Sequence, residues 1–263
     1  MRFNGADFEM NYHVDGPEGA PWVTLSNSLV CSTRMWDTQM AGLAKDYRVL
    51  RYDVRGHGES STPPPPYSID DLADDVLAIW DHLGIARSHW IGLSLGGMTG
   101  IRLADREPER VVTLTASDCR AEADETYAAM FVARAETTKE GGMEPLVEPT
   151  LQRFFTDDFR KARPDVVARY GEMIRRTTTD GHIGCCMALA GGRFADALPR
   201  LKMPTLFIGG RHDIGAPPHL MQAMHEAAPG STHIVLEDAG HISLEEQPEE
   251  YAEALAEHLR KSD

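Results

Sequence analysis

The chain has 263 residues, of which 42% are hydrophobic and 25% are charged; these proportions are those of a globular protein and exclude a disordered chain. The formal net charge of −15 argues against nucleic acid and anionic membranes as partners, because both would repel it. No apolar run reaches the ~18 residues needed to span a bilayer. Residues 1–10 lack the apolar region of a signal peptide, so we expect a cytoplasmic protein.

Four cysteines occur in the chain, at positions 31, 119, 185 and 186. No C-x-x-C pair is present, which argues against a zinc site. Adjacent cysteines such as Cys185 and Cys186 rarely bridge, and free thiols suit the reducing cytoplasm. We expect all four cysteines to be small buried side chains of the core.

The first half of the chain alternates between segments typical of strands and segments typical of helices. Strands are predicted at residues 8–14, 22–26, 48–53, 89–93 and 111–115. The segment Ser68-Ile-Asp-Asp71 resembles a capping box and predicts the start of a helix that ends at Gly84. Apolar residues recur within that helix about every 3.6 residues and define one buried face. A second helix is predicted at 97–106.

The alternation stops between residues 121 and 200, where helical periodicity continues without a convincing strand. It resumes with predicted strands at 204–208 and 232–236 and predicted helices at 218–227 and from Pro248 onward. Such alternation is typical of a mostly parallel sheet with helices on both faces. We therefore predict an α/β fold with a core of residues 1–120 and 201–263, and a helical lid inserted at residues 121–200.

The segment Gly92-Leu-Ser-Leu-Gly96 has the G-x-S-x-G pattern of a nucleophile elbow, in which a strand turns abruptly into a helix. Glycines on either side of the serine let neighbouring backbone approach the turn. The pattern alone is also compatible with an ordinary turn, but here it follows an apolar strand and precedes a helix. We predict that Ser94 is a nucleophile and that the Leu95 N–H faces the developing oxyanion.

A serine nucleophile needs a base, and an acid must orient that base. Among the chain's 11 histidines, His241 stands out because it follows Gly240 in the loop after the strand 232–236. Asp213 follows the strand 204–208 and lies between serine and histidine in chain order, as the acid does in this arrangement. Asp118, at the end of an earlier strand, is the alternative acid, and it is also compatible with a turn or cap role. We predict the triad Ser94, Asp213 and His241.

With these residues the chain resembles the α/β-hydrolase superfamily along its full length, and within it the 3-oxoadipate enol-lactonases. The enol-lactonases have an Asn-Ser pair where many relatives have His-Gly, and Asn27-Ser28 matches that pair. Val30 stands where the family usually has glycine, and Phe154 stands where it often has tryptophan. The matching segments are residues 25–29, 34–36, 52–58, 91–97, 153–155 and 240–243.

The resemblance implies an α/β-hydrolase fold and acyl transfer on a small-molecule lactone or ester, with no metal and no cofactor. It also implies that the Leu29 N–H is a second oxyanion donor beside Leu95. The family substrate carries a free carboxylate, which in a net-acidic protein needs an arginine. The predicted substrate-binding residues are Arg34, Arg120, Arg153 and Phe154. Each arginine is equally compatible with a solvated surface or a lid ion pair.

Three functions remain open on the sequence. The first is hydrolysis of 3-oxoadipate enol-lactone or a close lactone, and the second is a broader carboxylesterase or perhydrolase activity of the same triad. The third is a non-catalytic sensor of a small ligand, against which an intact triad argues. A serine at the elbow disfavours dehalogenases and epoxide hydrolases, whose nucleophile is an aspartate. A homo-oligomer is compatible with the sequence.

Overall fold

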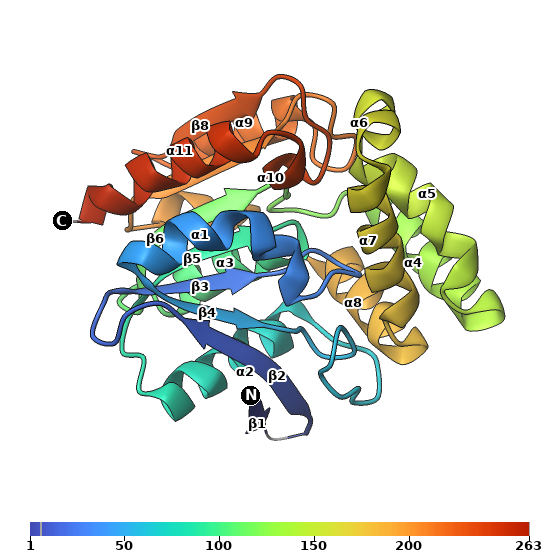
Figure 1. Ribbon diagram of the computed structural model, residues 1–263, viewed down its shortest axis with the longest axis horizontal. Helices are drawn as coiled ribbons and strands as arrows, with labels where there is room; N and C mark the ends of the chain where they lie inside the picture. Colours follow the sequence, from blue (N-terminus) through green and yellow to red (C-terminus); the bar gives the residue numbers. More distant parts are fainter. Residues whose placement is uncertain (6, 263) are drawn as a thin grey trace.

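The computed structural model describes residues 1–5 and 7–262, and in this part of the chain eight strands form one sheet in the order β1-β2-β4-β3-β5-β6-β7-β8 (Figure 1). The pairs β1–β2 and β2–β4 are antiparallel, whereas every neighbouring pair from β4 to β8 is parallel. The strands are β1 (Arg2–Asn4), β2 (Glu9–Asp15), β3 (Trp22–Ser26), β4 (Arg48–Tyr52), β5 (Ser88–Leu93), β6 (Val111–Ser117), β7 (Thr205–Gly210) and β8 (Thr232–Leu236). The predicted α/β class is confirmed.

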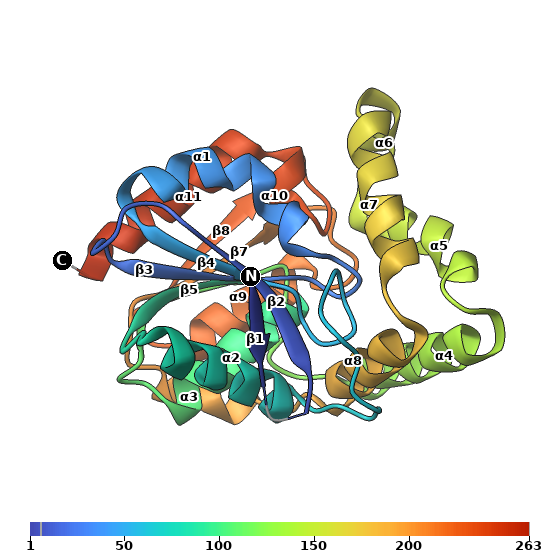
Figure 2. The same ribbon diagram turned by 60° about the horizontal axis from the view of Figure 1, so that its bottom comes forward.

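Helices cover both faces of this sheet (Figure 2). On one face α1 (Asp37–Asp46) contacts α11 (Pro248–Leu259), and on the other face lie α2 (Ile69–Leu83), α3 (Leu95–Arg106) and α9 (Pro218–Ala227). Every residue of β5 and β7 is buried, because helices cover these central strands from both sides. The short helices are η1 (Thr33–Trp36), η2 (Ala195–Arg200), α10 (Ser243–Glu246) and η3 (Arg260–Ser262).

Between β6 and β7 the chain forms helices that stand beside the sheet as a separate group, which we call the lid (Figures 1 and 2). Within the lid α4 packs against α8, and α5 packs against α7. The lid helices are α4 (Glu125–Gly141), α5 (Glu144–Phe154), α6 (Asp157–Ala162), α7 (Pro164–Arg176) and α8 (Thr179–Gly191). The η2 segment falls inside the predicted lid range 121–200, but it packs against α3 and α9 of the core.

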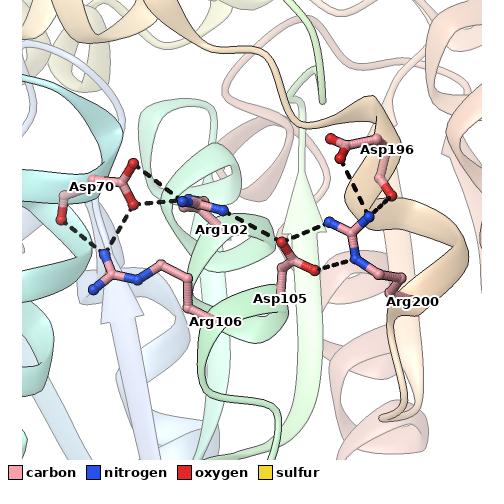
Figure 3. A network of polar contacts seen from close by, with 6 residues as sticks. All are labelled: Asp70, Arg102, Asp105, Arg106, Asp196 and Arg200. Carbon is pink, nitrogen blue, oxygen red and sulfur yellow. Dashed lines mark hydrogen bonds and ion pairs between the residues drawn. The ribbon is translucent and has the colours of Figure 1, made fainter.

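A network of ion pairs holds η2 to the core (Figure 3). Arg200 of η2 donates from Nε and Nη2 to the two carboxylate oxygens of Asp105 in α3, at 2.8 and 2.9 Å. Arg102 extends the network to Asp70 of α2, with 2.8 Å between its Nε and Asp70 Oδ1. Exposed ion pairs contribute about 1 kcal/mol or less each. We infer that the network mainly sets where the chain re-enters the core after the lid.

The signals for α2 are confirmed in detail. The Asp71 N–H donates to Ser68 Oγ at 3.1 Å, and the Ser68 N–H donates to Asp71 Oδ2 at 2.7 Å, which is a complete capping box. Gly84 ends the helix at φ 68°, a left-handed conformation that favours glycine. The elements that were not predicted include β1, α1 and the short helices η1 and α10. All four cysteines are buried and free, as expected.

Candidate active site

Ser94 lies at the sharp turn between β5 and α3. Its backbone has φ 56° and ψ −108°, a region that costs a residue other than glycine about 1–3 kcal/mol. The surrounding backbone holds the turn, since the Ser94 N–H donates to Ser117 O at 2.8 Å and the Met98 N–H donates to Ser94 O at 3.0 Å. This conformation places Ser94 at the apex of the turn, beyond the end of β5. Ser94 is nevertheless only 7% exposed, because the lid covers it.

The two glycines of the motif are required by close backbone contacts. A Cβ atom on Gly92 would lie 2.1 Å from Gly96 O, and a Cβ atom on Gly96 would lie 2.2 Å from Ser26 O. Neither backbone oxygen can move without disturbing the sheet or the helix. The elbow therefore forms only because both positions lack a side chain.

We expect Gly96→Ala to lower the free energy of unfolding by about 1–3 kcal/mol or more, the usual cost of overpacking. The added methyl group would push α3 away from β3 and displace the elbow. Chemical denaturation measures the loss of stability. Gly100→Ala cannot serve as a control for this variant, because a Cβ atom on Gly100 would itself clash with Trp90. Gly191→Ala, whose Cβ would meet no atom within 4 Å, is the matched control. Equal stability of the two variants would contradict the prediction.

His241 and Asp213 come together from the loops after β8 and β7. The distance between His241 Nδ1 and Asp213 Oδ2 is 2.8 Å, and both side chains are buried. The other Asp213 oxygen, Oδ1, accepts from the Gly215 N–H at 2.6 Å. Burial opposes ionisation of Asp213, but His241 and the N–H groups of Gly215 and Ala216 hold its pKa below the usual value. An ionised Asp213 can orient the His241 ring and stabilise its protonated form.

Asp118, the alternative acid, has different partners. It accepts from the Gly210 N–H at 2.9 Å and from Ser243 Oγ at 2.6 Å, and no hydrogen bond joins it to His241. Burial raises the pKa of Asp118 well above its usual range, and the nearby charge of Asp213 adds to the shift. Two neighbouring buried carboxyl groups thus have pKa values pushed in opposite directions. The member whose pKa is lowered is the one that contacts the histidine.

The backbone N–H groups of Leu29 and Leu95 have no protein acceptor among the described residues. Leu95 begins α3, where the helix dipole favours a negative charge. Leu29 lies in the loop after β3 and lines the same cavity as Ser94. The next residue, Val30, has φ 61°, a left-handed conformation in which a β-branched residue is rare.

The cavity above Ser94 lies between the core and the lid. Its volume is only about 20 Å³, room for about one water molecule. Phe154 of α5 forms one wall, with its ring stacked on His241 at 5.5 Å between centroids and 24° between planes. The lid is therefore closed on the site, and a substrate must displace lid side chains to enter. The lining residues are Ser28, Leu29, Val30, Ser94, Tyr127, Phe131, Arg134, Thr150, Arg153, Phe154 and His241.

Two half-buried arginines of the lid, Arg134 and Arg153, line this cavity, and neither forms an ion pair with a carboxylate among the described residues. Arg134 donates from Nη2 to Thr150 Oγ1 at 2.8 Å, and Arg153 donates from Nη1 to Met130 Sδ at 3.2 Å. Burial lowers the pKa of Arg134, and repulsion by Arg153 adds to the shift. An anion between the two guanidinium groups would relieve that repulsion. Arg134 was not among the predicted residues, because nothing in the local sequence distinguishes it from other lid arginines.

The other two predicted arginines do not reach this cavity. Arg120 donates to Asp124 Oδ2 at 2.8 Å and to Gly215 O at 2.5 Å, and its guanidinium lies 4.3 Å from the centre of the Tyr127 ring. Arg34 is exposed in η1 and lines a separate cavity of about 460 Å³ with His13 and Arg176. We conclude that Arg120 supports the Asp213 loop and that Arg34 lies away from Ser94.

The described residues contain no group of three or more His, Cys, Asp or Glu side chains that could hold a metal ion. Within the same part of the chain, no helix combines the length and the apolar composition that crossing a membrane requires.

Comparison with known proteins places the chain in a family. A family model described as the alpha/beta hydrolase fold matches residues 21–248. The 3-oxoadipate enol-lactonase 2 of Acinetobacter baylyi is 36% identical over 255 residues, which cover 97% of this chain and 94% of that protein. The crystal structure of the enol-lactonase from Burkholderia xenovorans LB400 has 36% identity and a TM-score of 0.93, and the match covers 96% of this chain and 97% of that one.

A second group of relatives has a different described activity. The putative carbamate hydrolase RutD of Stutzerimonas stutzeri is 29% identical over 255 residues, which cover 95% of this chain and 96% of that protein. The names of both groups describe hydrolytic enzymes. The chain belongs to the α/β-hydrolase fold family and is a hydrolase that resembles the 3-oxoadipate enol-lactonases.

Proposed function

We propose that this chain is a serine hydrolase that opens an enol-lactone bearing a free carboxylate, with 3-oxoadipate enol-lactone as its substrate. The observation that carries the proposal is the pair Arg134 and Arg153, which line the cavity of Ser94 and His241 without a carboxylate partner among the described residues. Unpaired cations are costly in a half-buried cavity, so the arrangement favours an anionic ligand. The similarity to two enol-lactonases supports the same substrate class.

The proposed reaction is acyl transfer. His241 takes the proton of Ser94 as Ser94 Oγ attacks the lactone carbonyl, and Asp213 stabilises the imidazolium that forms. The N–H groups of Leu29 and Leu95 bind the tetrahedral oxyanion, and each such donor contributes on the order of 2.7–4 kcal/mol. The enol oxygen then leaves, takes the proton from His241 and rearranges to a ketone. Water, activated by His241, hydrolyses the acyl-enzyme and releases the acid.

The similarity to RutD supports carbamate hydrolysis as a second candidate. The same triad and oxyanion donors would act on a carbamate carbonyl, and the two candidates differ in the charge and leaving group of the substrate. A broader carboxylesterase or perhydrolase activity and a non-catalytic sensor are further outcomes that one assay separates.

The first test measures kcat/KM of the purified protein on 3-oxoadipate enol-lactone, a neutral p-nitrophenyl ester and a simple carbamate. We expect about 10⁴ M⁻¹s⁻¹ or more on the enol-lactone, the lower end of ordinary enzyme efficiency. A higher value on the carbamate would favour the second candidate, and turnover of the ester alone would leave a general esterase. No turnover of any substrate, combined with saturable binding of the lactone, would leave a sensor.

The arginine pair gives a sharper prediction. We expect Arg134→Met and Arg153→Met each to raise KM for the anionic lactone by about 10–100-fold, since a hydrogen bond to a charged group contributes about 1.5–3 kcal/mol. The KM for the neutral ester should change much less. Arg34→Met is the matched control, because Arg34 lines a different cavity. Equal changes in KM for the lactone and the ester would remove the proposed role of the pair.

A further inference from the structure

The loop that carries His241 is bonded to the lid on both sides of the histidine. We call residues 237–242, between β8 and α10, the base loop. After His241, the Ile242 N–H donates to Phe154 O of the lid at 3.1 Å. His241 itself stacks on the Phe154 ring. The lid therefore contacts the backbone and the ring of the proposed base, in addition to covering the cavity.

Before His241, the bond to the lid runs through Glu246. This side chain of α10 is only 9% exposed and accepts three hydrogen bonds. Its Oε2 accepts from the Gly240 N–H at 2.5 Å. Its Oε1 accepts from the Thr156 N–H at 3.0 Å and from Thr156 Oγ1 at 2.6 Å. One carboxylate thus bridges the residue before His241 and the lid segment between α5 and α6.

The contact is close enough to restrict the sequence. A Cβ atom on Gly240 would lie 2.9 Å from Glu246 Oε2 and 3.0 Å from Phe154 O. A side chain at position 240 would therefore require the Glu246 carboxylate and the lid backbone to shift. Thr156 also caps α6, since its Oγ1 accepts from the Phe159 N–H at 3.3 Å. A shift of the segment 154–156 would therefore displace both α6 and the base loop.

We propose that Glu246 is a positioning residue that couples the lid to His241, so that the histidine is held in its reactive position only while the segment 154–156 is docked. The inference rests on the proposed function, in which His241 is the base. Entry of a substrate requires the lid to move, because the closed cavity holds about one water molecule. The coupling would disable the base while the site is open and restore it when the lid closes over the substrate.

Glu245, the preceding residue, offers a matched control. It is also buried and also bonds to the lid, where Arg169 and Tyr170 of α7 donate to its Oε1. Its side chain makes no hydrogen bond to the base loop among the described residues. Removing its charge loosens the lid but leaves the Gly240 contact in place. A comparison of the two glutamates therefore separates anchoring of the lid from positioning of the base.

The test compares Glu246→Gln with Glu245→Gln on p-nitrophenyl acetate, a small neutral ester that does not need the arginine pair. In Glu246→Gln the amide nitrogen replaces one accepting oxygen, so either Gly240 or Thr156 loses its acceptor. We expect kcat to fall about 10-fold or more with KM changed less than about threefold, since small misplacements of a catalytic group are costly. Glu245→Gln should keep kcat within about twofold of the wild type.

A second readout is the ¹H–¹⁵N spectrum of the histidine rings, in which the His241 signals are assigned with His241→Asn. We expect these signals to shift or broaden in Glu246→Gln and not in Glu245→Gln. On the lid side, Thr156→Val should lower kcat and Thr156→Ser should restore it, since serine keeps both the donor to Glu246 and the cap of α6.

Folded Glu246→Gln with wild-type kcat and unchanged His241 signals would overturn the proposal. An equal loss of kcat in Glu245→Gln would also overturn it, because general anchoring of the lid would then explain both. A wild-type protein that hydrolyses no ester would refute the proposed function instead. In that case the His241 signals still test whether Glu246 positions the histidine. Identical spectra of the wild type and Glu246→Gln would refute that coupling independently of activity.

Discussion

Ser94→Ala is expected to lower kcat on every ester and lactone substrate by at least about 10³-fold, because the alanine methyl group cannot form an acyl-enzyme. The fold should persist, since no hydrogen bond of the Ser94 side chain holds the elbow among the described residues. Both residues carry a Cβ atom, so the left-handed φ of 56° costs each of them a similar amount. A melting temperature near that of the wild type would show that the loss is chemical.

The measurement is the steady-state rate, with covalent labelling by a fluorophosphonate as a second readout. The wild-type protein should gain one adduct at Ser94 by mass spectrometry, and Ser94→Ala should gain none. A retained rate above a few per cent of the wild type, or an adduct at another serine, would show that the nucleophile lies elsewhere.

Asp213→Asn is expected to lower kcat by about 10⁴-fold, the size of effect seen when asparagine replaces the acid of a serine triad. The amide can present its NH₂ group to His241 Nδ1, which favours the wrong tautomer of the ring. Asp213 Oδ2 lies 2.8 Å from that nitrogen, so the exchange acts directly on the contact. The steady-state rate on the enol-lactone and on a neutral ester measures the effect, which should be the same for both substrates.

Asp118→Asn is the matched comparison, and we expect kcat within about 10-fold of the wild type. Asp118 bonds to Gly210 and Ser243 and not to His241, so its replacement leaves the contact between Asp213 and His241 in place. The main effect should be on stability, through the contacts with Gly210 and Ser243. If Asp118→Asn were the more damaging change, the acid of the triad would be the residue at the end of β6.

The local signals in the sequence predicted the central part of the fold well. β3 has the predicted bounds, and α2 has its predicted cap, buried face and terminal glycine, because capping and periodicity are properties of a few neighbouring residues. The elbow is equally local, since its two glycines and its serine lie within one turn. α3 begins two residues earlier than predicted, at Leu95, because the positive φ of Ser94 completes the turn in a single residue.

Helices and strands whose local sequence signals are weak were not predicted. In α1 only Gln39 and Leu43 are fully buried, and the apolar stripe of Met40, Leu43 and Ala44 covers little more than one turn of the helix. β1 has three residues, too few to show an alternating pattern. Both lie toward solvent, and contact with the rest of the fold, rather than their own composition, decides their structure.

The sequence by itself determined the order of strands and helices, the elbow at Ser94 and the loops that carry Asp213 and His241. It could not decide which arginines face the cavity, because a guanidinium's partner depends on packing between residues far apart in the chain. Arg120 finds Asp124 and Gly215, whereas Arg134 and Arg153 find no carboxylate and remain available to an anion. The same holds for Glu246, which meets Thr156 across 90 residues of sequence. Only the docking of the lid on the base loop creates that contact, and no local pattern encodes it.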